Sequence, residues 1–153
     1  MSDAIKIQSH KGEYKAIFSK NGLDILNENP VQNAIYIIDE NIVKLYGDRL
    51  SDILTSQRVL RITATEQNKS LDCFPEYIEQ LVKLNIRREQ VLVAIGGGIV
   101  QDITCFLAAT MMRGLPWLFF PTTLLAQADS CIGSKSSINS GEIKNILGTY
   151  TPP

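Results

Sequence analysis

The chain of 153 residues has the length of one domain, and 44% of its residues are apolar while 20% are charged. This composition excludes a disordered tail, and a net charge of −1 gives no sign of a nucleic-acid or membrane-surface partner. Three widely spaced cysteines and an N-terminus without an apolar leader predict a cytoplasmic protein with reduced thiols.

Apolar strand-like runs alternate with helical patterns along the chain. Strands are expected at 5–8 and 14–18 around a turn at 11–12, then at 34–38, 59–62, 91–95 and 117–120. Helices are expected at 40–56, 71–85 and 99–112, and a loop at 27–30. The run 91–95 is wholly apolar, which is typical of a strand buried on both faces. This order predicts one α/β domain with a doubly wound, mostly parallel sheet.

Three consecutive glycines, Gly96 to Gly98, separate the apolar strand 91–95 from the following helix. Such a turn lets a diphosphate approach the free amides of a helix N-terminus. The spacing differs from GxGxxG, and a tight structural turn explains it equally well. Asp102 is expected in the first turn of the helix, where it either benefits from the helix dipole or binds a cofactor.

Polar residues also follow two other expected strands. Asp39, with Asn41 two residues later, either caps the next helix or binds an adenosine ribose. Thr122 and Thr123 follow the strand 117–120 and open a helical run, for which capping by one threonine is a sufficient explanation.

Charge is scarce in the second part of the chain, because residues 96–153 hold six of the 31 charged side chains. Among these, Asp129 has mostly apolar neighbours in the sequence, so its carboxylate is expected to need a cation or a hydrogen-bonding ligand. Arg113, Lys135 and Lys144, together with Asn145, suit an anion such as a phosphate ester. The alternative for the segment 133–139 is a solvated surface loop.

Five segments together resemble 3-dehydroquinate synthase and its sugar-phosphate cyclase relatives. They are GGGIVQD (96–102), MRG (112–114), PTTLLAQADS (121–130), GSK (133–135) and KN (144–145). The resemblance extends from about residue 35 to residue 153. It implies a Rossmann-like, NAD-binding N-terminal domain spanning 1–153. A helical C-terminal domain would follow beyond residue 153 and hold a divalent metal, zinc or cobalt, so no metal ligand is expected within this chain.

The resemblance also implies the site residues. Cofactor contacts are expected at Asp39, Glu40, Asn41, Glu66, Lys69, Gly96, Gly97, Gly98, Ile99, Asp102, Thr122, Thr123 and Lys144. Substrate contacts are expected at Arg113, Asp129, Lys135 and Asn145, of which the last three are the expected catalytic residues. The partners implied are a small sugar phosphate, the C-terminal domain and a second copy in a homodimer.

The reaction that the resemblance implies is a redox-neutral elimination of phosphate with closure of a carbocycle, from a seven-carbon sugar-acid phosphate of the shikimate pathway. Cys105, Ser134 and Ile143 replace glycines that the family usually has, so a cyclase of the inosose or valiolone type is an alternative. A further alternative, if the natural chain ends near residue 153, is that the protein is a non-catalytic NAD-binding module. The isolated domain is expected to be inactive. Ile99 and the residues 124–127 disfavour an iron-dependent alcohol dehydrogenase.

Overall fold

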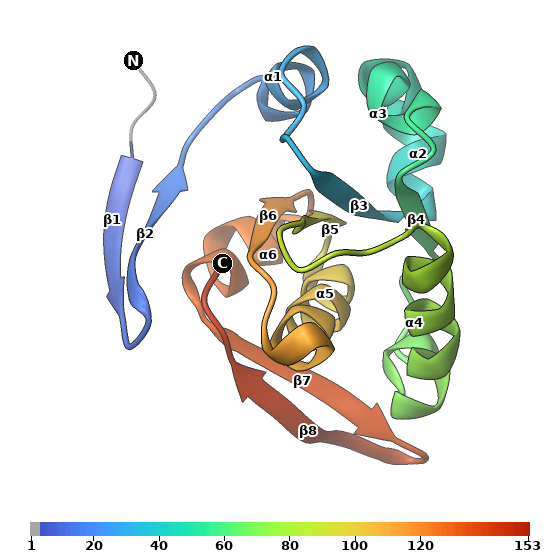
Figure 1. The fold of residues 1–153 in the computed structure, drawn as a ribbon. Helices are drawn as coiled ribbons and strands as arrows, with labels where there is room; N and C mark the ends of the chain where they lie inside the picture. The colour runs from blue at the N-terminus through green and yellow to red at the C-terminus, as the bar shows by residue number, and fades with distance from the viewer. Residues whose placement is uncertain (1–3) are drawn as a thin grey trace.

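The computed structural model describes residues 4–153, and Figure 1 shows the arrangement of their elements. A parallel sheet of four strands in the order β4-β3-β5-β6 forms the centre. These strands are β3 (Ala34–Asp39), β4 (Val59–Ile62), β5 (Val91–Gly96) and β6 (Trp117–Pro121). The helices are α1 (Gly22–Glu28), α2 (Glu40–Tyr46), α3 (Ser51–Thr55), α4 (Phe74–Lys83), α5 (Gly98–Thr110) and α6 (Leu124–Ala128).

The central strands bury side chains on both of their faces. On β3, Ile35 and Ile37 join one apolar cluster, whereas Tyr36 and Ile38 join a second cluster on the opposite face. This alternation follows from the two-residue period of a strand. Helices α4 and α5 cover the first face, while α1, α2 and α3 cover the second. The predicted doubly wound α/β fold is therefore confirmed, with helices on both faces of a parallel sheet.

Two antiparallel hairpins lie outside the central sheet (Figure 1). The first pairs β1 (Ala4–Ser9) with β2 (Gly12–Ile17). The second pairs β7 (Lys135–Ser140) with β8 (Ile143–Tyr150) and packs against α5. The alternative of a solvated surface loop at 133–139 is wrong, because most of that segment is strand β7 with Ile138 fully buried in the core.

Several predicted boundaries also need correction. The expected helix 40–56 is broken by a 3-10 turn, Gly47–Leu50, between α2 and α3. The expected helix 71–85 begins with the 3-10 turn Leu71–Cys73, because Pro75 suits only the first turn of a helix and starts α4 there. Strand β6 was expected to be buried, but it lies at the sheet edge and leaves Leu118 39% exposed.

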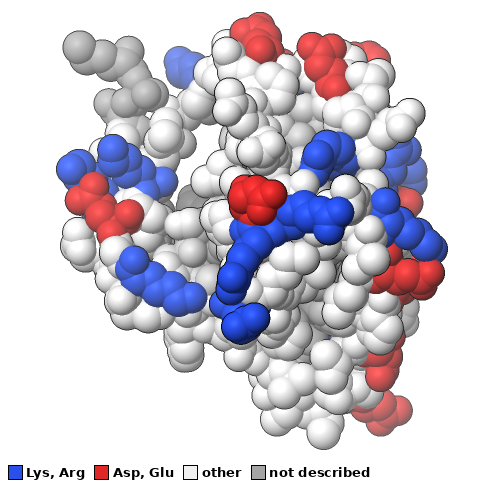
Figure 2. Space-filling view, in the orientation of Figure 1, with Lys and Arg blue, Asp and Glu red and all other residues white. Residues whose placement is uncertain are grey.

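Opposite charges lie side by side on the surface. Figure 2 shows Lys and Arg side chains gathered near the centre of one face beside an acidic group, with further acidic groups along its margins. This mixture accords with the net charge of −1. Among residues 4–153, no helix combines the length and the apolar character that crossing a membrane requires.

Candidate active site

The carboxyl ends of the parallel strands meet at the point where the strand order reverses. The chain passes from β3 to β4 on one side and from there to β5 on the other, so the reversal lies between β3 and β5. Asp39 ends β3 and Gly96 ends β5, and a Cβ atom on Gly96 would lie 3.4 Å from the Cβ of Asp39. In open α/β sheets, this crevice is where ligands bind.

The N-terminus of α5 opens into this crevice. Gly97 is the N-cap residue, and no side chain among residues 4–153 caps the helix, so its first amides are available to a ligand. A Cβ on Gly97 would approach Thr123 Cγ2 to 2.9 Å, whereas a Cβ on Gly98 would meet nothing within 4 Å. The turn therefore packs closely on one side and leaves open space at Gly98.

A cavity of about 730 Å³ extends from Gly98 to the β7–β8 hairpin. Its walls come from α5, the segment that follows α6, and the two strands of the hairpin. The lining residues are Lys69, Gly98, Gln101, Asp102, Asp129, Ser130, Gly133, Lys135, Ser136, Ser137, Asn145, Ile146, Leu147, Gly148, Thr149 and Tyr150. Three predicted catalytic residues, Asp129, Lys135 and Asn145, thus share one cavity with three predicted cofactor residues.

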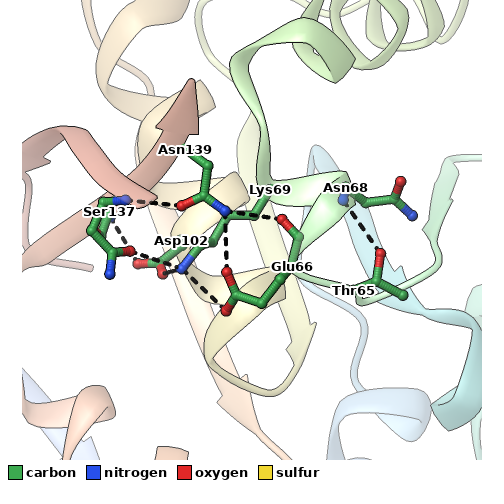
Figure 3. Close-up of polar contacts among 8 residues, drawn as sticks. Thr65, Glu66, Asn68, Lys69, Asp102, Ser137 and Asn139 are labelled. Carbon is green, nitrogen blue, oxygen red and sulfur yellow. Dashed lines mark hydrogen bonds and ion pairs between the residues drawn. The ribbon is translucent and has the colours of Figure 1, made fainter. Parts of the chain in front are cut away.

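Lys69 lies at the centre of a polar network beside this cavity (Figure 3). Its ammonium donates to Asp102 Oδ2 at 3.2 Å and to Asn145 Oδ1 at 3.2 Å, and it lies 3.5 Å from Glu66 Oε1. The side chain of Lys69 is only 7% exposed. A buried ammonium needs such partners, because an unpaired buried charge is costly.

Further hydrogen bonds connect this network to the hairpin. The backbone amide of Ser137 donates to Asp102 Oδ1 at 3.0 Å, and the amide of Asn139 donates to Glu66 Oε2 at 3.1 Å. Asn139 Oδ1 in turn accepts from the backbone amide of Asn145 at 2.9 Å. The network therefore joins α5, the 3-10 turn Gln67–Lys69 and both hairpin strands at one wall of the cavity.

The two carboxyl groups of the network have pKa values shifted in opposite directions. Burial raises the pKa of Asp102 from 3.8, and this effect outweighs the opposing effects of Lys69 and of the Ser137 amide. The hydrogen bond from Asn139 and the charge of Lys69 lower the pKa of Glu66 from 4.5. Glu66 is half exposed and keeps its charge more readily than Asp102 does.

The raised pKa of Asp102 predicts a pH-dependent stability. Because the folded state holds the proton more tightly, the contribution of Asp102 to stability is complete below pH 3.8 and is lost as the pH rises through the folded pKa. We therefore expect the wild type to gain stability relative to Asp102→Asn as the pH falls toward 3.8. Urea unfolding at a series of pH values measures this difference. A relative loss by the wild type on acidification would mean that Lys69 outweighs burial.

Asp102 and Asp129 occupy environments that differ from those expected. Helix α5 begins at Gly98, so Asp102 falls beyond the first turn, where Lys69 and the Ser137 amide hold its carboxylate instead of the helix dipole. Asp129 is exposed rather than enclosed by apolar side chains. It contacts solvent at the cavity wall, so it does not require a cation from the protein.

Arg113 and Lys144 do not join the predicted anion cluster within this chain. Arg113 lies exposed beyond the C-terminus of α5, the end opposite to Gly98. Lys144 is exposed on β8 beside the cavity-lining Asn145, and its charge acts on Glu66. Among the described residues, only Lys69 and Lys135 supply cationic groups to the cavity wall.

The remaining predicted cofactor residues lie along the carboxyl edge of the sheet. Asp39 caps α2, because its Oδ1 accepts from the Asn41 backbone amide at 2.9 Å. Glu40 accepts from the Thr63 hydroxyl at 2.9 Å and lines a second, smaller cavity of about 120 Å³. The capping alternative thus accounts for one oxygen of Asp39.

The residues that flank the glycine turn complete this edge. Thr123 caps α6, with its hydroxyl accepting from the Ala126 amide at 3.3 Å. The Thr122 hydroxyl is buried without a partner among residues 4–153. Ile99 packs against the apolar core, so its side chain has a structural role.

Sequence reasoning missed three polar residues of the site, namely Gln101, Ser137 and Asn139. Gln101 directly precedes Asp102 in the glycine segment, but a lone glutamine carries no recognisable pattern. Lys135, Ser137 and Asn139 follow one another at intervals of two residues, which is the spacing of side chains on one face of a strand. This spacing would have indicated the two residues only if the segment 135–139 had been predicted as a strand.

Within residues 4–153, no group of three His, Cys, Asp or Glu side chains is placed to hold a metal ion. The three cysteines, Cys73, Cys105 and Cys131, are free.

Comparison with known proteins gives one family match. The family described as "3-dehydroquinate synthase N-terminal" matches residues 59–153. The 3-dehydroquinate synthase of Alkaliphilus oremlandii (strain OhILAs) is 38% identical over 155 residues, covering 97% of this chain and 43% of that protein. The chain therefore spans less than half the length of this relative.

Two solved structures are also similar. A 2-deoxy-scyllo-inosose synthase superposes with a TM-score of 0.84 at 24% identity, over 99% of this chain and 45% of that one, which shows the fold. ValA, a 2-epi-5-epi-valiolone synthase from Streptomyces hygroscopicus subsp. jinggangensis 5008 with NAD+ and Zn2+ bound, gives a TM-score of 0.70 at 32% identity. That match covers 83% of this chain and 38% of ValA.

Proposed function

The chain belongs to the 3-dehydroquinate synthase family, and from this membership we propose that it forms the NAD-binding part of a phosphate-eliminating lyase. The proposed substrate is a seven-carbon sugar-acid phosphate that becomes a carbocycle, as in the shikimate pathway. A C-terminal domain would supply the divalent metal, zinc or cobalt, and a second copy would complete a homodimer. The observation that carries the proposal is the single cavity shared by Gly98, Lys69, Asp102, Asp129, Lys135 and Asn145.

The residues at the carboxyl edge fit a dinucleotide. The uncapped amides of α5 suit a diphosphate, and the open space at Gly98 allows its close approach. The carboxylate of Asp39 offers a further polar contact at the same edge, because capping of α2 uses only one of its oxygens. When bound, NAD accepts and returns a hydride, so the overall reaction is redox-neutral. Residues 4–153 do not offer a group of three His, Cys, Asp or Glu side chains that fits a metal ion.

The wall of the cavity that the β7–β8 hairpin forms suits the anionic part of a sugar phosphate. Lys135 and Asn145 offer an ammonium and an amide, and both act as donors to phosphate or hydroxyl oxygens. The exposed carboxylate of Asp129 accepts from a substrate hydroxyl and orients it toward the cofactor. Holding both ends of the substrate in this way lowers the entropic cost of the reaction.

A cyclase for another sugar phosphate is the second candidate. ValA, at 32% identity, carries the name of a valiolone synthase, so the family match alone leaves the substrate open. Ser136, Ser137 and Thr149 also line the cavity beside Lys135, and their hydroxyl groups suit a neutral polyol chain as well as a sugar acid.

Phosphate release by the full-length gene product tests the proposal. NAD+ and zinc or cobalt are supplied, and the seven-carbon heptulosonate phosphate and sedoheptulose 7-phosphate are offered side by side. Release from the first alone supports the shikimate reaction, and release from the second alone supports the other cyclases. Dinucleotide binding without release from either substrate would favour a binding module.

Replacement of Gly98 by alanine tests the dinucleotide site directly. A Cβ at this position meets no protein atom within 4 Å, so we expect Gly98→Ala to fold with unchanged stability. The added methyl group occupies the space of the diphosphate, so the Kd for NAD+ should rise about tenfold or more. Isothermal titration measures the Kd. Gly133→Ala is the matched control, because it adds the same group to the substrate side of the cavity at an ordinary contact distance of 3.5 Å.

A further inference from the structure

Gln101 is a buried polar side chain that reaches from α5 to the segment carrying Asp129 and Lys135. Gln101 is only 3% exposed, and its Nε2 donates to the carbonyl oxygen of Ser130 at 2.7 Å. The nitrogen must be the atom that faces Ser130, since two carbonyl oxygens at this distance would repel each other. The Oε1 atom is buried without a partner among residues 4–153.

Ser130 follows Asp129 and begins the 3-10 turn Ser130–Ile132. Within the segment, the Gly133 amide donates to the Ser130 carbonyl at 3.1 Å, so this carbonyl accepts one local bond and one from Gln101. Farther along, the Tyr14 hydroxyl donates to the Ile132 carbonyl. The bond from Gln101 therefore fixes the start of the segment to α5, immediately after Asp129.

Asp102, the next residue of α5, binds the chain on the C-terminal side of Lys135. Asp102 accepts from the Ser137 amide, two residues after Lys135, while Gln101 binds Ser130, five residues before it. Adjacent residues of one helix thus bracket the segment. A helix is a rigid reference, and its N-terminus also faces the proposed dinucleotide.

We propose that Gln101 is a positioning residue whose amide fixes the segment from Asp129 to Lys135 against α5. In this way Gln101 sets the places of both side chains in the cavity relative to the N-terminus of the helix. The catalytic consequence rests on the proposed function, whereas the structural coupling does not.

The structural coupling is tested by hydrogen exchange of the backbone amides of residues 130–137 in the full-length protein. Gln101→Met has similar length but no donor, so exchange in this segment should accelerate about tenfold. Thr104→Val is the matched control, because Thr104 lies in the same helix, is fully buried and has a hydroxyl without a partner in the described part of the chain. It should leave exchange in the segment unchanged.

A second variant separates the hydrogen bond from the packing. Gln101→Glu keeps the shape, but an ionised carboxylate cannot donate to Ser130, whereas the protonated acid can. Exchange in the segment, taken relative to the wild type at each pH, should be fast near neutral pH and slow as the pH falls. A ratio that does not change with pH would contradict a role for the donated bond.

Kinetics then test the catalytic consequence. Gln101→Met should lower kcat for phosphate release about a hundredfold, because a small misplacement of reacting groups is costly, while the Kd for NAD+ stays within about twofold. The proposal would be overturned if Gln101→Met exchanged its amides and released phosphate at wild-type rates. It would also be overturned if the change in exchange and the loss of kcat were no larger in Gln101→Met than in Thr104→Val. If the wild type releases no phosphate from either sugar phosphate, the proposed function fails, and the exchange comparison still decides the role of Gln101.

Discussion

Lys69→Met is expected to lower the free energy of unfolding by about 3–5 kcal/mol, because it leaves the carboxylate of Asp102 buried without its cation. The side chains of Lys69 and Asp102 are only 7% and 20% exposed, so water screens this pair poorly. The variant also removes a donor to Asn145 and weakens the wall of the cavity. Urea denaturation, with the midpoint shifted and the slope unchanged, measures the loss.

The double variant Lys69→Met/Asp102→Asn is the control for this prediction. Asparagine is neutral and still accepts from the Ser137 amide, so it removes the unpaired charge and keeps that bond. The double variant should therefore be more stable than Lys69→Met alone. If Lys69→Met lowered the free energy of unfolding by less than about 1 kcal/mol, the Lys69–Asp102 pair would contribute no more than an exposed salt bridge does. That result would contradict the prediction.

Gly148→Ala is expected to have the second large effect, by disrupting the β7–β8 hairpin. A Cβ on Gly148 would lie 2.2 Å from the carbonyl oxygen of Ser136, which is a backbone atom of the paired strand. Neither strand can yield without breaking its pairing, so the cost should reach about 3 kcal/mol, the upper part of the range for overpacking. Because Lys135 and Asn145 belong to this hairpin, substrate turnover should fall with the loss of pairing.

Thermal unfolding together with phosphate release measures both effects of Gly148→Ala. Gly133→Ala is the control for thermal unfolding, since its new Cβ would lie at an ordinary contact distance of 3.5 Å from the nearest atom. Equal melting temperatures for the two variants would show that the hairpin adapts to the added methyl group.

The sequence predicted the centre of the sheet well because the two inner strands, β3 and β5, are buried on both faces. The run 91–95 contains no polar residue, and strand β5 extends only one residue beyond it. Strands β3 and β4 likewise agree with the runs expected at 34–38 and 59–62. The resemblance also implied that Asp129, Lys135 and Asn145 belong to one site, and these residues do line one cavity.

The hairpin β7–β8 could not be predicted, because its sequence is rich in serine, glycine and asparagine, which also favour loops. Only Ile138 of β7 is a buried apolar residue, so the alternation that identifies a strand is weak. Long-range partners also escaped prediction. Nothing in the local sequence of Lys69 indicates that Asp102, 33 residues away, will be its partner.

The two halves of the cavity are built on different sheets. The parallel sheet presents the glycine turn, whereas the antiparallel hairpin presents Lys135 and Asn145, and α5 packs against both. Substitutions in the hairpin can therefore change the proposed substrate contacts while the proposed dinucleotide site stays unchanged. Transplanting residues 135–150 between relatives of different specificity becomes a rational way to exchange their substrates, provided that Asp102 and the Ser137 amide still meet.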